Sequence, residues 1–480
     1  MESKEILLNI SSNSVLKSPT TYLPTKTQPW PRQSSLVIGP DNDQGDIACE
    51  QVRDYAASKL WTCSGQTIYF FCDIHADADA FFLSLEASGG VIRTGPADAD
   101  FELTEEGRHA RFIIGGDCFD KGPDNLRLLE AIHQLYLKGA DLILLAGNHD
   151  IRTYLGIFYA ESKEPLLDHL FVRMGKKTVP LLAEIYTRFV EGTAEDAKFI
   201  DANIYDLLFP AEEWYQEFPK AAQCWIRPEK LEKEIGRIRE KTVEFEEQLH
   251  KVGLDIHKAY AALAKFRELF FEPGGRYFWF FDEMKLAHRE GSYLFVHAGV
   301  DDTIAKTLFE EGTESLNRQF REELQKDPFV LYHGALGNAF RTKYRSFDFD
   351  FTAKGVDSLH RSGLHAIVHG HRNILQGQRV VIRQGMLNFE CDASVDCRTR
   401  ELEGLFGPGG AVLKFLTNGD VHGISTDYPF VKRFHPGIVT IFNRSFDASI
   451  DATLDTALDT SLDTSLDTNQ ESQHRDLAHV

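Results

Sequence analysis

The chain has 480 residues, of which 42% are hydrophobic and 26% charged, a balance typical of a globular chain with a large core and an added domain. Its formal net charge of -21 argues against a surface for nucleic acid or anionic membranes, although local basic groups can still bind phosphate. Seven cysteines without a C-x-x-C pair predict neither a disulfide framework nor a thiolate zinc site, and they indicate a reducing compartment.

The N-terminal residues lack the basic start and apolar core of a secretory signal, and no run is long enough to span a membrane. We therefore expect a cytoplasmic protein with no membrane and no nucleic-acid partner, while export without an N-terminal signal stays open. Residues 1–45 are expected to be a flexible leader, because residues 11–45 are rich in Ser, Thr, Pro, Asn and Asp without periodicity.

Residues 46–160 read as the first half of an α/β core, in which three apolar runs each end in polar side chains. The runs 67–72, 111–114 and 142–146 lead into Asp73-Ile74-His75, a Gly-Gly-Asp segment that ends at Asp120, and Gly147-Asn148-His149-Asp150. Helices are predicted after each, over Ala78–Ala87, over Asn125–Leu137 and from Ile151. The carboxyl ends of neighbouring parallel strands converge, so these polar groups can share a site.

The tetrapeptide at 147–150 has two interpretations when taken alone. The Asn148 amide oxygen can ligate a divalent cation, and the neighbouring His149 can protonate a leaving oxygen. The alternative is a polar turn whose side chains cap the next helix. The other motifs favour the first interpretation.

Residues 161–290 are predicted to form a helical insertion. Mostly apolar residues recur at alternating spacings of four and three, which is a heptad pattern. They are Leu231, Ile235, Ile238, Thr242, Phe245, Leu249, Val252 and Ile256. They fit either an amphipathic helix packed within the chain or a coiled-coil hairpin beside the active site, begun by Pro228 and turned at Gly253. The hairpin would offer a place for a protein partner.

Residues 291–442 are expected to complete the core. Apolar runs at 293–296 and 366–368 lead into His297 and His369-Gly370-His371, and closing strands are predicted within 380–382, 386–394 and 409–415. Residues 443–480 repeat Leu-Asp-Thr with aspartates every four residues. A helix would bring those like charges together, so a disordered acidic tail is expected.

The motifs D-x-H, G-D-x-x-D, G-N-H-D, a lone His and G-H all occur here in that order. This series resembles the metallophosphoesterase (calcineurin-like) superfamily. Asp120-Lys121-Gly122 stands where its phosphoprotein phosphatase-like branch has Asp-Arg-Gly. The resemblance covers roughly residues 65–155 and 290–425, and it implies a four-layer α/β core in which helices flank a β-sandwich.

The resemblance also implies a pair of divalent metal ions. Asp73, His75 and Asp117 would hold the first ion, and Asp117, Asn148, His297 and His371 the second. Asp117 is the expected bridge, because a carboxylate can join two cations while offsetting their charge. A mixed oxygen and nitrogen shell without thiolate suits Mn, which we favour, and also Fe or Zn.

Four further residues receive roles from the same resemblance. His149 is the expected general acid, and Asp120 is the carboxylate that would hold its imidazole. Lys121 replaces an arginine that binds phosphate in the family, and it offers a point charge where arginine offers a fork. Arg341 is the preferred second phosphate ligand and Arg345 the alternative, although a solvated basic face explains that stretch equally well.

The implied function is metal-dependent hydrolysis of phosphomonoesters, with a protein phosphatase acting on phospho-Ser, phospho-Thr or phospho-Tyr favoured. Its partner would be a phosphorylated protein or a small phosphoester. One alternative is a nucleotide or dinucleoside polyphosphate hydrolase, which an aromatic base-stacking pocket would support. Another is an interaction protein that uses the helical insertion on a silent phosphatase core.

Overall fold

The computed structural model describes residues 23–30, 49–196, 198–199, 202–345 and 348–436. The predicted acidic tail at 443–480 and most of the predicted leader lie outside these ranges. Within the leader, β1 (Thr27–Pro29) pairs in parallel with β14 (Val431–Phe434), and the Trp30 side chain that follows is buried. The expectation of a flexible leader therefore does not apply to residues 27–30.

Two large β-sheets form the centre of the structure. The first has seven strands, in the order β1, β14, β13 (Val421–Ser425), β12 (Ala411–Phe415), β2 (Ile68–Phe71), β5 (Arg111–Ile114) and β6 (Asp141–Leu144). The second has five strands, in the order β10 (Arg379–Arg383), β11 (Met386–Glu390), β9 (Ala366–His369), β8 (Tyr293–Val296) and β7 (Ala287–Glu290). A short hairpin pairs β3 (Val91–Arg93) with β4 (Phe101–Leu103).

Aromatic side chains join the two sheets face to face. The ring of Phe295 on β8 lies 5.7 Å from Phe70 on β2 and 5.3 Å from Phe415 on β12, measured between centroids. All four residues of β2 and of β8 are buried, as expected for strands covered on both faces. These contacts make the core a β-sandwich, and they confirm the predicted α/β class.

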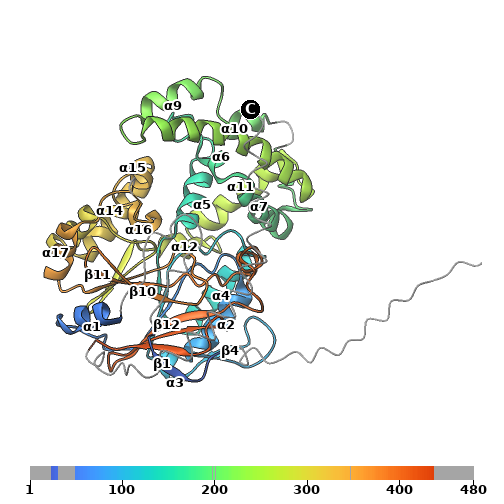
Figure 1. Cartoon of the computed structure of the whole chain (residues 1–480). Helices are drawn as coiled ribbons and strands as arrows, with labels where there is room; N and C mark the ends of the chain where they lie inside the picture. The colour runs from blue at the N-terminus through green and yellow to red at the C-terminus, as the bar shows by residue number, and fades with distance from the viewer. Residues whose placement is uncertain (1–22, 31–48, 197, 200–201, 346–347, 437–480) are drawn as a thin grey trace, which may run out of the picture. The chain divides into compact units, whose positions relative to one another are not determined.

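Helices cover the outer faces of the sandwich (Figure 1). On the seven-stranded sheet, α2 (Ala78–Ser88) packs against β12 and β13, and α4 (Asn125–Leu137) packs beside α2. The second half of the core contributes α13 (Asp302–Glu310), α14 (Thr313–Lys326), α15 (Pro328–His333), α16 (Asn338–Arg341), α17 (Ala353–Arg361) and α18 (Cys397–Glu403). The chain also forms α1 (Cys49–Ala57), α3 (Glu105–Arg108) and α5 (Asn148–Phe158).

The insertion between the two halves of the core is helical. Its elements are α6 (Leu170–Met174), η2 (Gly175–Thr178), α7 (Val179–Ile185), η3 (Tyr186–Val190), α8 (Ile204–Leu208), α9 (Trp214–Ala222), α10 (Pro228–Lys251), α11 (Ile256–Phe271) and α12 (Phe278–Asp282). Their buried side chains join the same hydrophobic cluster as Cys118 and Phe119 of the second motif. No helix in the described ranges combines the length and apolar character needed to cross a membrane.

The heptad stretch from Leu231 to Leu249 lies on α10, which begins at Pro228 and ends before Gly253, a residue with φ +75°. Val252 follows the end of α10, and Ile256 begins α11. The helix buries Leu231, Ile238, Phe245 and Leu249 and packs against η2, α6 and α9. This is the arrangement of an amphipathic helix within one chain. A protein partner at the insertion stays a prediction.

Glu184 on α7 links the insertion to the core by capping α4. Its carboxylate accepts hydrogen bonds from the backbone N–H groups of Asn125 (3.0 Å) and Leu126 (2.9 Å) and from the Asn125 amide (2.7 Å). Burial is the main cause that raises the pKa of Glu184 to about 7, whereas the pKa of an unfolded Glu is about 4.3. Between these values the folded chain binds more protons, so this group's stabilising contribution falls as pH rises from about 4.3 to 7.

We expect the Glu184→Gln variant to lack this titration. The wild type should therefore lose roughly 1–2 kcal/mol of unfolding free energy relative to the variant between pH 5 and pH 7.5. Urea unfolding at both pH values measures the difference, with Glu191→Gln, an exposed substitution in the same segment, as the control. An equal difference at both pH values would contradict the assignment.

Candidate metal centre and active site

All five polar motifs lie at the carboxyl ends of parallel strands. In the first sheet β2, β5 and β6 run parallel to one another and lead into Asp73, the loop at 115–120 and Asn148. In the second sheet β8 and β9 run parallel and lead into His297 and His371. The sandwich therefore brings polar ends from both sheets to one place, as the sequence predicted.

The backbone of the motif loops adopts an uncommon conformation. Of the ten non-glycine residues with positive φ in the described ranges, six are candidate site residues, with φ between 49° and 76°. They are Asp73, His75, Asp117, Asp120, Lys121 and His371. Such backbone costs about 1–3 kcal/mol per residue and persists where the surroundings enforce it, commonly at functional sites.

Two histidines are oriented by backbone carbonyls. His297 Nδ1 lies 2.8 Å from the carbonyl oxygen of Gly115, and His75 Nδ1 lies 3.2 Å from that of Phe119. A Nδ1–H that donates to a carbonyl leaves the Nε2 lone pair free for a cation. Both Nε2 atoms face the Asp117 carboxylate, at 3.5 Å for His297 and 3.8 Å for His75.

The donor atoms form two overlapping clusters. Asp73, His75 and Asp117 place one donor atom each within 4.8 Å of one another, and Asp117, His297 and His371 do the same. Asp117 belongs to both. Asn148 joins the second cluster, because its Oδ1 lies 3.2 Å from His297 Nε2. The structure thus brings together all six residues predicted as metal ligands, and their chemistry fits two cations that share one carboxylate.

The electrostatics of this cluster favour bound cations. Burial alone would lower the pKa of His297, but Asp117 and Asp73 raise it to about 10. Burial lowers the pKa values of His75 and His371 well below 6.5, which favours the neutral imidazole that binds a metal ion. The raised pKa of His297 shows that Asp117 and Asp73 favour positive charge at this place, and a bound cation would supply that charge in place of the His297 proton.

Close approach of the loops explains the glycines of two motifs. A Cβ atom at Gly370 would collide with the Asp73 carboxylate, and one at Gly147 would collide with the Asp117 backbone. Asp150, the last residue of the tetrapeptide, is fully buried and accepts hydrogen bonds from the backbone N–H groups of Asp117 (2.8 Å) and Cys118 (2.9 Å). Its carboxylate therefore fixes the loop that carries the central ligand.

His149 and Asp120 form the pair predicted from the sequence. His149 Nδ1 lies 2.8 Å from Asp120 Oδ2, and its Nε2 lies 3.9 Å from Asp117 Oδ2. Asp117 Oδ1 also accepts the backbone N–H of His149 at 2.8 Å. Burial lowers the pKa of His149, while Asp117 and Asp120 act in the opposite direction. The imidazole is thus held by one nitrogen and presents the other to the metal ligands.

Lys121 also lies at the cluster, with its Nζ 2.8 Å from His75 Nε2, so the nitrogen assigned to a cation faces the Lys121 ammonium as well as Asp117. Burial alone would lower the pKa of Lys121, but Asp392, Asp396, Asp117 and Asp73 raise it, so the side chain stays charged. The buried Asp392 belongs to the Asp-Ala-Ser segment before the closing hairpin and was assigned no role from the sequence.

Arg341 is placed elsewhere. Its Nε donates to the carbonyl of Tyr332 at 2.7 Å, and its guanidinium lies over the Tyr332 ring. Its Nη2 also donates to the carbonyl of His333, so the Arg341 side chain is held at α15. The structure therefore does not bring Arg341 to His149 and Asp120, and the local sequence pattern around residue 341 gave no means of seeing this.

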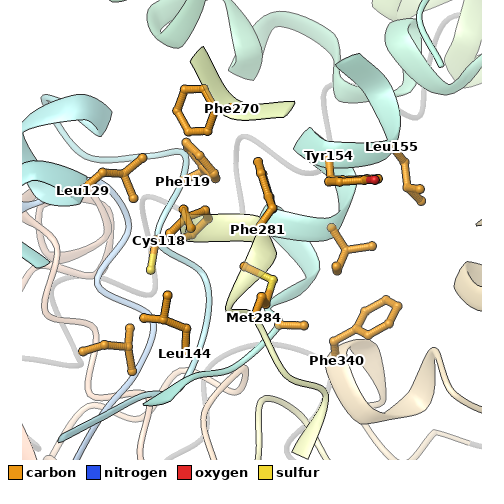
Figure 2. Packing of buried hydrophobic residues seen from close by; sticks show 14 of the residues in the cluster. Cys118, Phe119, Leu129, Leu144, Tyr154, Leu155, Phe270, Phe281, Met284 and Phe340 are labelled. Atoms are coloured by element: carbon orange, nitrogen blue, oxygen red, sulfur yellow. The ribbon is translucent and has the colours of Figure 1, made fainter. Parts of the chain in front are cut away.

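Two cations that the sequence did not reveal lie beside the His149–Asp120 pair. Arg152 on α5 and Lys177 on η2 line a small pocket together with His149 and Asp120. Phe119 lines the same pocket, and its ring packs against Phe281 at 6.0 Å (Figure 2). The insertion thus contacts the second motif directly.

Comparison with known families gives one match. Residues 67–234 match the model of the calcineurin-like phosphoesterases, a stretch that contains Asp73, His75, Asp117, Asn148 and His149. This part of the chain matches that family. The phosphoesterase is accordingly a hydrolase, and the donor clusters are its candidate metal-binding residues.

No curated protein matches the chain in sequence. Among solved structures, a cold-active protein-tyrosine phosphatase of a psychrophilic Shewanella species is 14% identical, with a TM-score of 0.38, over 84% of this chain and 95% of that one. A protein serine/threonine phosphatase from Saccharomyces cerevisiae is 12% identical, with a TM-score of 0.35, over 81% and 87% of the two chains. At these scores neither similarity carries an argument about residues or substrates.

Proposed function

We propose that the phosphoesterase uses two divalent metal ions to hydrolyse phosphomonoesters, and that its substrates are phosphorylated side chains of proteins. The observation that carries the proposal is the shared position of Asp117 in two donor clusters, with an aspartate-held imidazole beside it. Asp73 and His75 would complete one metal site, and Asn148, His297 and His371 the other.

The donor set of carboxylate, amide and imidazole groups, with no thiolate, suits Mn, Fe or Zn. When bound, such ions withdraw charge from phosphoryl oxygens and allow water to attack phosphorus as hydroxide at neutral pH. The residues of the chain then orient the ester and supply a proton. Lys121 would hold a phosphoryl oxygen as a point charge.

His149 is placed to act as general acid. As the bond between phosphorus and the leaving oxygen breaks, the proton on Nε2 passes to that oxygen, and the imidazole becomes neutral. Asp120 holds Nδ1–H throughout, which fixes the ring and favours the protonated form before the transfer. Phosphoserine needs this proton more than an aryl phosphate does, because an alkoxide is the poorer leaving group.

The pocket beside His149 does not support the nucleotide alternative. Phe119 is the one Phe, Tyr or Trp among the residues that line it, and the Phe119 ring is buried against Phe280 and Phe281. It therefore offers no open face for stacking a base.

The test is hydrolysis of an aryl phosphate, a phosphopeptide panel and dinucleoside polyphosphates, each with and without added Mn. Metal-dependent turnover of phosphopeptides is the expected result. Turnover confined to nucleotides would replace the proposal with the nucleotide hydrolase. No turnover with Mn, Fe or Zn would leave the interaction protein as the better hypothesis, which a pull-down with the full chain would then examine.

A further inference from the structure

The pocket beside His149 concentrates positive charge in a chain whose net charge is -21. Arg152 and Lys177 line it, and Asp120 is the only carboxylate among its lining residues. That carboxylate already accepts a hydrogen bond from His149 Nδ1. The pocket therefore carries more cationic charge than its own wall neutralises.

Two further cationic side chains, Lys241 and Arg173, lie close to the residues that line the pocket. Lys241 on α10 donates a hydrogen bond to the carbonyl of Arg173 on α6, while Arg173 pairs with Glu234 at 3.1 Å. Burial first, and then Arg152 and Arg173, lower the pKa of Lys241 to about 8. Burial likewise lowers the pKa of Lys177. Cations that repel one another in this way are stabilised when an anion enters between them.

The His149 ring lines this pocket and also reaches the metal ligands. Its Nε2 edge faces Asp117, and its Nδ1 edge faces Asp120. Lys177 Nζ lies near the Nδ1 edge, 3.7 Å from Asp120 Oδ2. Since the acid that protonates the leaving oxygen forms part of the pocket wall, the pocket is positioned for groups attached to that oxygen.

We propose that this pocket, formed by Arg152 on α5 and Lys177 of the insertion, binds a second anionic group of the substrate on the leaving-group side. In a phosphoprotein that group is a carboxylate or a second phosphoryl group on a residue next to the phosphorylated one. The proposal rests on the proposed function for its substrate class. It assigns the insertion a direct part in choosing substrates.

The test measures binding as well as turnover. Fluorescent peptides carry a non-hydrolysable phosphonomethyl group in place of phosphoserine, and the neighbouring residue is Gln, Glu or a second phosphonomethyl residue. Wild type should bind the two anionic peptides about fivefold more tightly than the Gln peptide, and added salt should reduce this preference. Comparison of the Glu and phosphonate peptides decides between a carboxylate and a phosphoryl group.

Lys177→Gln should abolish most of the preference. Lys176→Gln is the matched control, because Lys176 is the adjacent residue and its Nζ instead contacts Glu244 at 3.2 Å. It should retain the preference. Circular dichroism checks that both variants fold.

The outcomes separate this proposal from the proposed function. Equal affinity of wild type for all three peptides would overturn the second anion site while phosphopeptide turnover stood. A charge preference that depends on Lys177, without turnover of any phosphopeptide, would support the site and refute the function. A Lys177→Gln variant that weakened all three peptides equally would assign the pocket to the reacting phosphate and overturn the proposal.

Discussion

Replacement of Asp117 by asparagine is expected to reduce metal-dependent hydrolysis about a thousandfold, equivalent to about 4 kcal/mol at the transition state. The asparagine carbonyl can take the place of Oδ1, which accepts the His149 N–H at 2.8 Å, so the loop should keep its conformation. The amide NH2 would then face His297 and His75 and carry no charge. The loss should therefore come from the cations and not from misfolding.

Two measurements make this prediction specific. Metal content per chain after dialysis should fall together with kcat, and the thermal unfolding curve of the metal-free protein should stay cooperative. Asp141→Asn is the control, because Asp141 lies at the opposite end of β6 and pairs with Arg111. If Asp117→Asn kept both metal content and activity, Asp117 would not bridge the two clusters.

The sequence predicted those parts of the site whose residues directly follow a recognisable strand. Apolar runs end at polar motifs, so β2, β5, β6, β8 and β9 and the polar residues after them were predicted together. Helix caps are equally local. Asp77 and Asp124 accept hydrogen bonds at the starts of α2 and α4, next to the predicted boundaries. Convergence of the motifs followed from a general property of parallel strands.

What the sequence did not predict depends on how distant elements pack. Arg152 and Lys177 are 25 positions apart in sequence and meet only because η2 and α5 line the same pocket. Arg341 was assigned from its neighbours in sequence, but its donors are used by the Tyr332 carbonyl nine residues earlier. The strand β1 has three residues in a polar stretch and is held by β14, which lies some 400 residues later.

The insertion is where locally predicted residues meet residues that only packing brings together. Phe119 lies within the second motif, and its ring packs against Phe270 on α11 and against Phe280 and Phe281 on α12. Figure 2 shows Phe119 near Phe270, in the cluster that also contains Tyr154. Changes in the packing of the insertion should therefore reach the loop that carries Asp117 and Asp120.

Replacement of His149 by alanine should lower kcat by a factor that depends on the leaving group. A phosphoserine peptide has a poor alkoxide leaving group, and its kcat should fall by about 10²–10⁴ when the general acid is lost. An aryl phosphate with an acidic phenol needs little protonation, so its kcat should fall by no more than about tenfold. Asp120→Asn should give an intermediate loss, because the imidazole remains but its Nδ1–H loses a charged partner.

The decisive measurement is the dependence of kcat on leaving-group pKa across a series of aryl and alkyl phosphates. It should be steeper for His149→Ala than for wild type, and His109→Ala, an exposed histidine paired with Glu105, should leave it unchanged. Equal losses for aryl and alkyl esters would show that His149 positions the substrate and does not protonate it. The proton would then have to come from a group other than the His149–Asp120 pair, because only a proton donor responds to the basicity of the oxygen that leaves.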